Sequence, residues 1–374
     1  MFKAVIIRLF PNKHQESLLR RFAGAARWVW NWGLALNEAR HQAGSKPFTG
    51  YELARQLTAI KKLPATAWLS EISKHTLAKA LSDLWGAYQS FYRKLRTGVK
   101  AGFPKFKAKY ASVPAFYTRY DRLHTDGKNR IHIEKIGYIR YKSHLSLNGL
   151  KLLNPRIKFE AGKWLLKCVI EADTQTPAIT LSDVCMGIDV GVKSLAVLSF
   201  GGRKRVFKNI NRSHKLRRLI RKLKHSQRTL DRRQKGSHNR SKARIKIREL
   251  YGRIKHIRHD YIQQVTSKII AMRPKAIVLE DLNISGMLKN SHISRAVGEQ
   301  NLYMFREVLE RKANNAGIAV KFADRFYPSS KTCSGCGHVR EKLLLSERIY
   351  VCPECGLTID RDFNAARNLQ RLAE

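Results

Sequence analysis

Residues 333–368 read CSGCGHVREKLLLSERIYVCPECGLTIDRDFNAARN, and the rest of the chain is organised around this stretch. It contains two Cys-x-x-Cys pairs, each followed by a glycine. That spacing is typical of two tight knuckles that hold one structural zinc ion in tetrahedral geometry. Asp362 follows the last cysteine closely, so the zinc knot would hold its carboxylate in place. The four predicted zinc ligands are Cys333, Cys336, Cys352 and Cys355.

Asp362 is predicted to be the third acid of a metal site whose other members lie far upstream. Asp189 sits in a strand-like run, residues 186–192 (MGIDVGV), where it shares a face with two glycines, so metal and phosphate can approach it closely. Glu280 ends a later apolar run and can turn toward Asp189 if the two strands are neighbours, whereas Asp281 would point the other way. Three such carboxylates can bind two Mg²⁺ ions, an arrangement that hydrolyses phosphodiesters.

The charge of the chain points to a polyanionic partner. Lys and Arg number 73 against 28 acidic residues, a formal net charge of +45 with a pI near 10.5. Such an excess is too large and too widely spread for an ordinary solvated surface, and it indicates nucleic acid. With 43% hydrophobic residues the chain can bury a sizeable core in two or three domains.

No apolar run approaches the roughly 20 residues that a membrane span needs, and the first residues are too short and too broken for a signal peptide. We therefore expect no membrane partner and a cytoplasmic protein that is nucleoid-associated when bound to DNA. Cys168 and Cys185 stand singly in strand-like runs, where burial is the expected fate, so no disulfide framework is implied.

The N-terminal part is predicted to be a β-barrel that carries an inserted helical lobe. A strand over residues 2–10 is followed by a helix from Asn12 and a second long helix from Ser73, and β-like runs occupy residues 113–172. Between them, residues 102–109 (GFPKFKAK) alternate aromatic and basic side chains, as a nucleic-acid groove or a strand would. The tryptophans at 28, 30 and 32 are more typical of a core than of a base-stacking platform.

Pro177 marks the expected linker to a second domain. Residues 203–258 are strongly basic and carry two leucine- and isoleucine-rich stripes, which predict a long helical hairpin that attracts phosphate. Residues 286–298 are predicted to form a flexible lid, and Asp362 to lie in the first turn of a terminal helix. The order of strands and helices is the one that a ribonuclease H-like domain would give, with the zinc ribbon inserted before its last helix.

Several motifs together resemble one known family, the TnpB family of transposon-encoded RNA-guided DNA nucleases, which are related to type V CRISPR effectors. Its likeness covers nearly the whole chain and is carried by Gly187-Ile-Asp-Val-Gly, Val278-Leu-Glu-Asp-Leu-Asn, Tyr327-Pro-Ser-Ser-Lys-Thr-Cys-Ser-Gly-Cys-Gly, Cys352-Pro-Glu-Cys-Gly and Asp360-Arg-Asp-Phe-Asn-Ala-Ala-Arg-Asn. The resemblance implies that Asp189, Glu280 and Asp362 are RuvC-type catalytic acids. It also implies a guide RNA derived from the transposon, and double-stranded DNA cut beside a short flanking motif.

On this basis we expect a multidomain α+β protein. A wedge β-barrel would comprise residues 1–10 and 101–176, and a helical recognition lobe residues 11–100. A RuvC-like nuclease domain would comprise residues 177–326 and 358–374, with a zinc-ribbon insert over 327–357 that binds target nucleic acid. The predicted nucleic-acid-binding residues are Lys74, Lys79, Lys105, Lys107, Tyr117, Thr118, Arg217, Arg221, Arg244 and Arg248.

Two alternatives remain open, a catalytically silent RNA-guided DNA-binding regulator and a DNA transposase that uses a carboxylate triad. The guide sequence, the flanking motif, the cut positions and the oligomeric state cannot be derived from the sequence.

Overall fold

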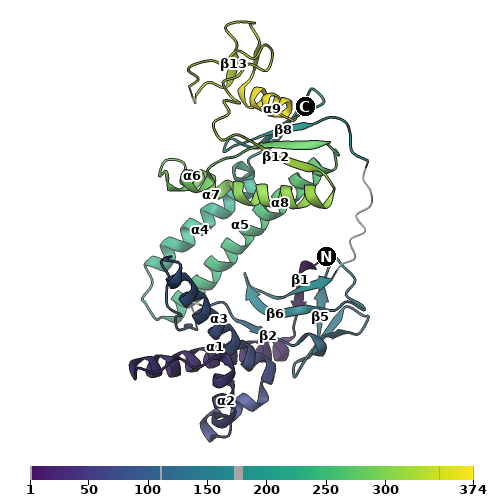
Figure 1. The fold of residues 1–374 in the computed structure, drawn as a ribbon. Helices are drawn as coiled ribbons and strands as arrows, with labels where there is room; N and C mark the ends of the chain where they lie inside the picture. Colours follow the sequence, from purple (N-terminus) through teal and green to yellow (C-terminus); the bar gives the residue numbers. More distant parts are fainter. Residues whose placement is uncertain (1, 110–111, 172–179, 345, 374) are drawn as a thin grey trace. The chain divides into compact units, whose positions relative to one another are not determined.

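The computed structural model describes residues 2–109, 112–171, 180–344 and 346–373 (Figure 1). The expected linker residue Pro177 lies outside them. The chain divides into two compact units, residues 1–174 with 234–249 and residues 175–233 with 250–374. Within the described residues, none of the helices has the length and apolar composition that crossing a bilayer requires.

The helices are α1 (Lys13–Gln42), α2 (Gly50–Ile60), α3 (Lys74–Arg96), α4 (His214–Asp231), α5 (His238–Ile270), α6 (Ile284–Lys289), α7 (Ser294–Gln300), α8 (Leu302–Asn315) and α9 (Arg361–Arg371), with 3-10 turns η1 (Pro64–Glu71), η2 (Tyr120–Arg122) and η3 (Ile210–Arg212).

The first unit combines three helices with a seven-stranded antiparallel sheet of order β2-β6-β7-β1-β5-β4-β3. Strand β1 lies in the middle of this sheet, although α1, α2 and α3 separate it in sequence from its neighbours (Figure 1). Closure of the sheet into a barrel stays a prediction. Its strands are β1 (Phe2–Phe10), β2 (Ala115–Tyr117), β3 (His124–Thr125), β4 (Arg130–Ile133), β5 (Gly137–Lys142), β6 (Leu153–Glu160) and β7 (Lys163–Glu171).

Helix α1 begins where the sequence predicts, because its first turn is capped. The Asn12 side chain accepts a hydrogen bond from the Gln15 backbone N–H at 2.8 Å, and the Gln15 side chain accepts one from the Asn12 N–H at 3.1 Å. This reciprocal capping box satisfies two backbone donors that a helix start otherwise leaves unpaired.

Residues 101–108 form no strand, so the strand interpretation of the aromatic and lysine alternation is wrong. Side chains of α1, rather than a neighbouring strand, form hydrogen bonds with the backbone of this segment. Trp30 Nε1 donates to the Lys105 carbonyl at 3.2 Å, and the Asn31 amide exchanges two hydrogen bonds with the Lys107 backbone at 3.1 and 2.8 Å. Phe103 packs edge-on against Tyr88, with ring centroids 5.3 Å apart.

The second unit is built on a five-stranded sheet of order β10-β9-β8-β11-β12, in which β11 runs parallel to both of its neighbours and β8, β9 and β10 are antiparallel. One face packs against α5 and α8, and α9 packs on β8, β9 and β11 (Figure 1). The strands of the unit are β8 (Met186–Val190), β9 (Ser194–Phe200), β10 (Arg203–Lys208), β11 (Ala276–Glu280), β12 (Ala319–Ala323), and the zinc-module hairpin β13 (Ile349–Val351) and β14 (Thr358–Asp360).

Two expectations for this unit need correction. The basic helices begin at His214, because residues 203–208 pair with β9 as strand β10. The segment 286–298 is not an irregular loop, since α6 and α7 occupy most of it and Val297 is buried in the core, and its role as a lid stays a prediction.

Candidate active site

Two of the three predicted acids lie at the ends of adjoining strands. Strands β8 and β11 pair in parallel, with Gly187 opposite Val278 and Ile188 opposite Leu279. The next residues of the two strands on the Gly187 face are Asp189 and Glu280, because side chains two apart along a strand share a face. Ile188 and Leu279 point the other way, into the core beneath α5 and α8.

Helix α9 brings the third acid over the same face. Asp360 caps the helix by accepting a hydrogen bond from the Phe363 N–H at 3.0 Å, and Asp362 lies in the first turn, as predicted. The helix approaches β8 so closely that a Cβ atom added at Gly187 would lie 1.9 Å from the Ala366 carbonyl oxygen and 2.4 Å from the Gln370 nitrogen. The bare face of Gly187 therefore receives a helix, whereas the sequence interpretation reserved it for metal and phosphate.

The three carboxylates interact electrostatically. Burial raises the pKa of Asp189 well above its usual range, and the charges of Glu280 and Asp362 raise it further. Burial also raises the pKa of Glu280, against a hydrogen bond from the Ser329 hydroxyl and the charge of Arg361, which lower it. Partly buried carboxylates that repel one another indicate a site at which a bound cation would be favourable.

Asp281, the alternative to Glu280, lies outside this cluster. Its carboxylate accepts hydrogen bonds from Arg325 at 2.7 Å and from Arg306 at 3.0 Å, and these bonds lower its pKa. Glu280, the last residue of β11, and Asp281, which follows it, thus face different environments, as the alternation of an extended chain favours.

The four predicted zinc ligands also converge. The Sγ atoms of Cys333, Cys336, Cys352 and Cys355 all lie within 4.8 Å of one another, and among the residues that the structure describes this is the one such group of possible metal ligands. Each knuckle turns through a left-handed glycine, Gly337 at φ +84° or Gly356 at φ +69°. Four thiolates this close fit one tetrahedral zinc ion.

Hydrogen bonds connect the turn before the cysteines, residues 329–332, to Glu280 upstream and to α9 downstream. Ser329 donates its hydroxyl proton to Glu280. The buried Asn368 of α9 donates to the Ser329 carbonyl at 2.8 Å and to the Thr332 carbonyl at 2.6 Å. Asn364, one helical turn earlier, donates to the same Thr332 carbonyl at 2.6 Å and accepts from the Ser334 N–H at 2.9 Å. The segment 329–334, which leads into the four-cysteine cluster, therefore fixes α9, and Asp362 with it.

The sequence interpretation missed Ser329, Asn364 and Asn368. The four-residue spacing of the two asparagines was a usable signal, because residues four apart share one face of a helix.

A basic cavity of about 570 Å³ adjoins the acids. Asp360 and Asp362 line one part of it, and residues of β9, β10, η3 and the turns beside them line the remainder, together with Tyr261 of α5. Its cationic lining residues are Lys193, Lys204, Lys208 and Arg212. Cationic side chains beside a carboxylate cluster suit a phosphodiester backbone.

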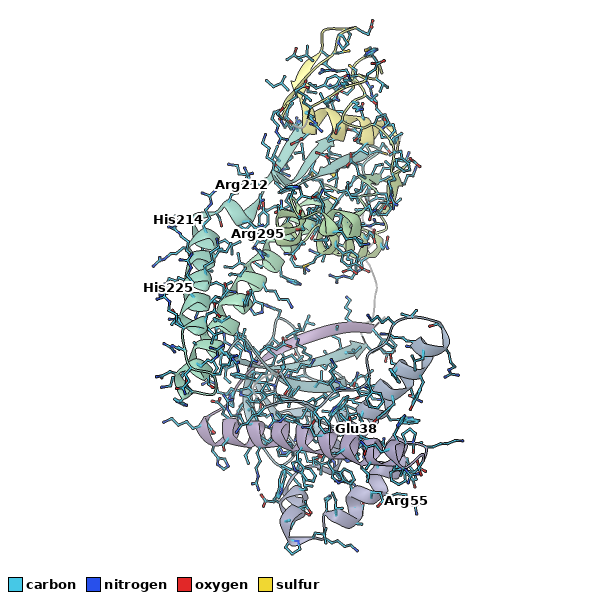
Figure 2. The ribbon with its side chains drawn as sticks, turned by 90° about the vertical axis from the view of Figure 1, so that its left-hand side faces the viewer. Glu38, Arg55, Arg212, His214, His225 and Arg295 are labelled. Atoms are coloured by element: carbon cyan, nitrogen blue, oxygen red, sulfur yellow. The ribbon has the colours of Figure 1, made fainter. Side chains whose placement is uncertain are left out.

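A second basic cavity, of about 460 Å³, is lined by Arg217, Ile220, Arg221 and Arg295. Figure 2 shows Arg212 and His214 where α4 begins, with Arg295 of α7 beside them. Two of the arginines predicted to bind nucleic acid thus share a pocket with one that the sequence interpretation missed.

The remaining nucleic-acid candidates differ in accessibility. Lys74, Lys105, Arg244 and Arg248 are exposed. Thr118, in contrast, is buried at 3% exposure, which leaves its side chain little room to contact a ligand. Lys79, Lys107 and Tyr117 line one cavity of about 220 Å³ in the first unit.

Three family models match parts of the chain. Residues 168–291 match the family described as "Probable transposase" (OrfB of IS605), residues 303–369 match "Cas12f1-like, TNB domain", and residues 1–46 match a helix-turn-helix domain of the same OrfB group. The cryo-EM structure of a Cas12f1–sgRNA–target DNA complex aligns over the full length of both chains at 16% identity, with a TM-score of 0.40.

Two relatives bear the name "Putative RNA-guided DNA endonuclease". InsQ of Escherichia coli K12 is 32% identical over 98% of this chain and 91% of its own length. The Streptomyces pristinaespiralis protein is 33% identical over 98% of this chain and 88% of its own length. Identity at this level over nearly all of both chains shows that the protein described here belongs to the TnpB family.

Proposed function

We propose that this protein is an RNA-guided DNA endonuclease encoded by a transposable element. It would bind a guide RNA from that element and cleave double-stranded DNA beside a short flanking motif. The names of its relatives and its net charge of +45 support a nucleic-acid enzyme. In such a protein, base pairing with the guide selects the target, and the protein holds the paired strands by their backbones.

The observation that carries the proposal is the convergence of Asp189, Glu280 and Asp362 on one sheet face. Their oxygen donors, and the burial and mutual repulsion that raise the pKa of Asp189, fit hard divalent cations such as Mg²⁺. Bound in pairs, such cations supply an activated water and stabilise the leaving oxygen of a phosphodiester. The order β10-β9-β8-β11-β12 supports a ribonuclease H-like, RuvC-type domain as the scaffold.

The chain's own residues would position this reaction. The hydroxyl of Ser329 orients Glu280, and the asparagines of α9 keep Asp362 over β8. Lys204 and Lys208 line the cavity beside Asp362, where they can bind phosphates of the strand to be cut. The carboxylates therefore need only hold cations, while neighbouring lysines hold the substrate.

The other parts of the chain would recognise nucleic acid. We propose a wedge domain over residues 1–10 and 101–176, a recognition lobe over 11–100, a nuclease domain over 177–326 and 358–374, and a zinc ribbon over 327–357. The cavity shared by Lys79, Lys107 and Tyr117 supports the first unit as the reader of the flanking motif.

Carboxylate-to-amide substitutions test the proposal. D189N, E280Q and D362N should each retain RNA and DNA binding but lose cleavage of a supercoiled target plasmid in Mg²⁺. D281N is the matched control, because it makes the same chemical change next to Glu280 but outside the cluster, and it should still cleave.

The same preparation separates the alternatives. The nuclease should co-purify with RNA, seen as a high 260/280 nm absorbance ratio that falls after ribonuclease treatment, and it should cut without joining strands. Strand joining at element ends would instead indicate the transposase. Unchanged activity of D189N in every assay would indicate the silent regulator and refute the nuclease.

A further inference from the structure

Three tryptophans of the first unit form an open aromatic corner rather than a closed core. Trp28 and Trp32, one turn apart on α1, hold their rings parallel within 2°, with centroids 6.5 Å apart. Trp68 of η1 meets Trp28 edge-on at 77°, with centroids 6.0 Å apart. All three are only partly buried, whereas Trp30 between them is 8% exposed and belongs to the core. The core interpretation of this cluster therefore holds in full for Trp30, whereas Trp28 and Trp32 pack against the core but keep part of their rings open.

This corner bounds a cavity of about 580 Å³. That volume lies within the range of small-ligand sites, roughly 300–1,000 Å³, and exceeds what one nucleotide fills. The lining residues other than the tryptophans are Arg21, Gly24, Ala25, Arg27 and Asn31.

Gly24, in the middle of α1, lines the cavity and has no side chain that would fill it. A glycine inside a helix costs about 1 kcal/mol relative to alanine. Close packing does not require it here, because among the described residues a Cβ atom at this position would meet only the Arg27 guanidinium, at 4.0 Å. The glycine therefore leaves open a space that the described part of the chain does not fill.

The charge around the cavity is positive. No acidic residue appears among its described lining residues. Arg21 pairs with Glu71 at 2.5 Å, but both side chains are about half exposed, and an exposed ion pair of this kind is weak enough to exchange with a phosphate. Arg27 also lines the neighbouring cavity that contains Lys79 and Lys107.

We propose that this cavity is a groove that binds an unpaired nucleotide of a single nucleic-acid strand. The base would stack in the corner made by Trp28, Trp32 and Trp68, and its phosphate would meet Arg27 and Arg21. Aromatic rings beside cationic groups are the usual means of holding single strands, because every base offers a face for stacking. An aliphatic peptide would gain little from the two arginines.

The site deepens the proposed function, since it presumes a nucleic-acid partner. It uses none of the three carboxylates, however, so the full-length D189N protein can test it by binding alone. The strand could be RNA or DNA, because both present the same base and phosphate.

The probes are 12-nucleotide RNA and DNA single strands that carry 5-iodouracil, used at high salt to suppress backbone binding. Irradiation should cross-link them to Trp28, Trp32 or Trp68, as identified by mass spectrometry of the digested protein. Cross-linking of RNA alone, of DNA alone or of both identifies the source of the nucleotide. Strands that cross-link only outside the groove would overturn the proposal.

Affinity provides the second readout. W28A should weaken binding of the cross-linking strand by roughly 5- to 150-fold, the loss expected for one stacking contact, and W28F should restore most of it. Y51A is the matched control, because Tyr51 is 75% exposed on α2 of the same unit but does not line the groove.

G24L keeps the inference testable if W28A fails to fold. It fills the cavity without removing a packed ring, and it replaces glycine by a better helix former. Thermal unfolding should show a protein at least as stable as the parent, while affinity falls as for W28A. A stable G24L that binds both strands as tightly as the parent would overturn the proposal.

Discussion

Replacing Gly187 by alanine should displace the helix that carries Asp362. The added Cβ would lie 1.9 Å from the Ala366 carbonyl oxygen, and ordinary contact begins near 3.4 Å, so α9 must retreat by about 1.5 Å. The Ala366 oxygen and the Gln370 nitrogen, which lies 2.4 Å away, both belong to the backbone and cannot rotate away. Overpacking of this kind costs roughly 1–3 kcal/mol, and a shift of about 1 Å in a reacting group can cost about 100-fold in rate. We expect G187A to lose at least 100-fold in DNA cleavage.

G191A, directly after the end of β8, provides the control. Its added Cβ would meet nothing closer than the Ser194 carbonyl oxygen at 3.7 Å, and neither glycine has a positive φ. Cleavage of a supercoiled plasmid by the purified ribonucleoprotein should therefore be near parental for G191A and absent or slow for G187A, with guide binding equal in both. G187A cutting at the parental rate would refute the close packing of α9 on β8 and the role given to Asp362.

Three further outcomes follow from contacts in the two units. Chelation of zinc, or C352S, should abolish cleavage but not RNA binding, because the four-cysteine module that fixes α9 would unfold. Mass spectrometry of the metal content and a plasmid-cleavage assay check this. N368A should lower the free energy of unfolding by about 1–3 kcal/mol, since the buried Ser329 carbonyl loses its donor and the Thr332 carbonyl keeps only the one from Asn364; denaturant titration of N368A against the parent measures it, and an unchanged midpoint would contradict it. Burial lowers the pKa of Lys107 to about 8. Between about pH 8 and 10.5 the unfolded chain therefore binds more protons than the folded chain, and the free energy of unfolding should rise with pH by about 1–2 kcal/mol, after allowance for solvent screening. In denaturant titrations, K107M should remove that rise.

Periodicity and spacing predicted the scaffold of both units. The capping box at Asn12, the basic helices and the terminal helix with Asp362 in its first turn follow from local rules, and the structure confirms them. The segment around Lys105 could not be predicted in this way, because distant side chains of α1 bind its backbone. Residues 286–298 look polar in sequence, yet α6 and α7 occupy most of them and Val297 is buried.

The site was predictable where chemistry depends on a few residue types at fixed spacing. The convergence of the four cysteines is confirmed, and the structure brings Asp189, Glu280 and Asp362 to one face, although their catalytic role stays a prediction. The reason given for Gly187 was incomplete, because no local pattern shows that a helix from 180 residues downstream occupies its face.

The dispersion of the three acids over the chain has a consequence during protein synthesis. A ribosome delivers Asp189 first, Glu280 about 90 residues later and Asp362 last, after both cysteine knuckles have emerged. A polypeptide that stops before residue 362 thus has at most two of the three carboxylates. Under the proposed function, such a fragment would lack a complete metal site even where it still bound nucleic acid.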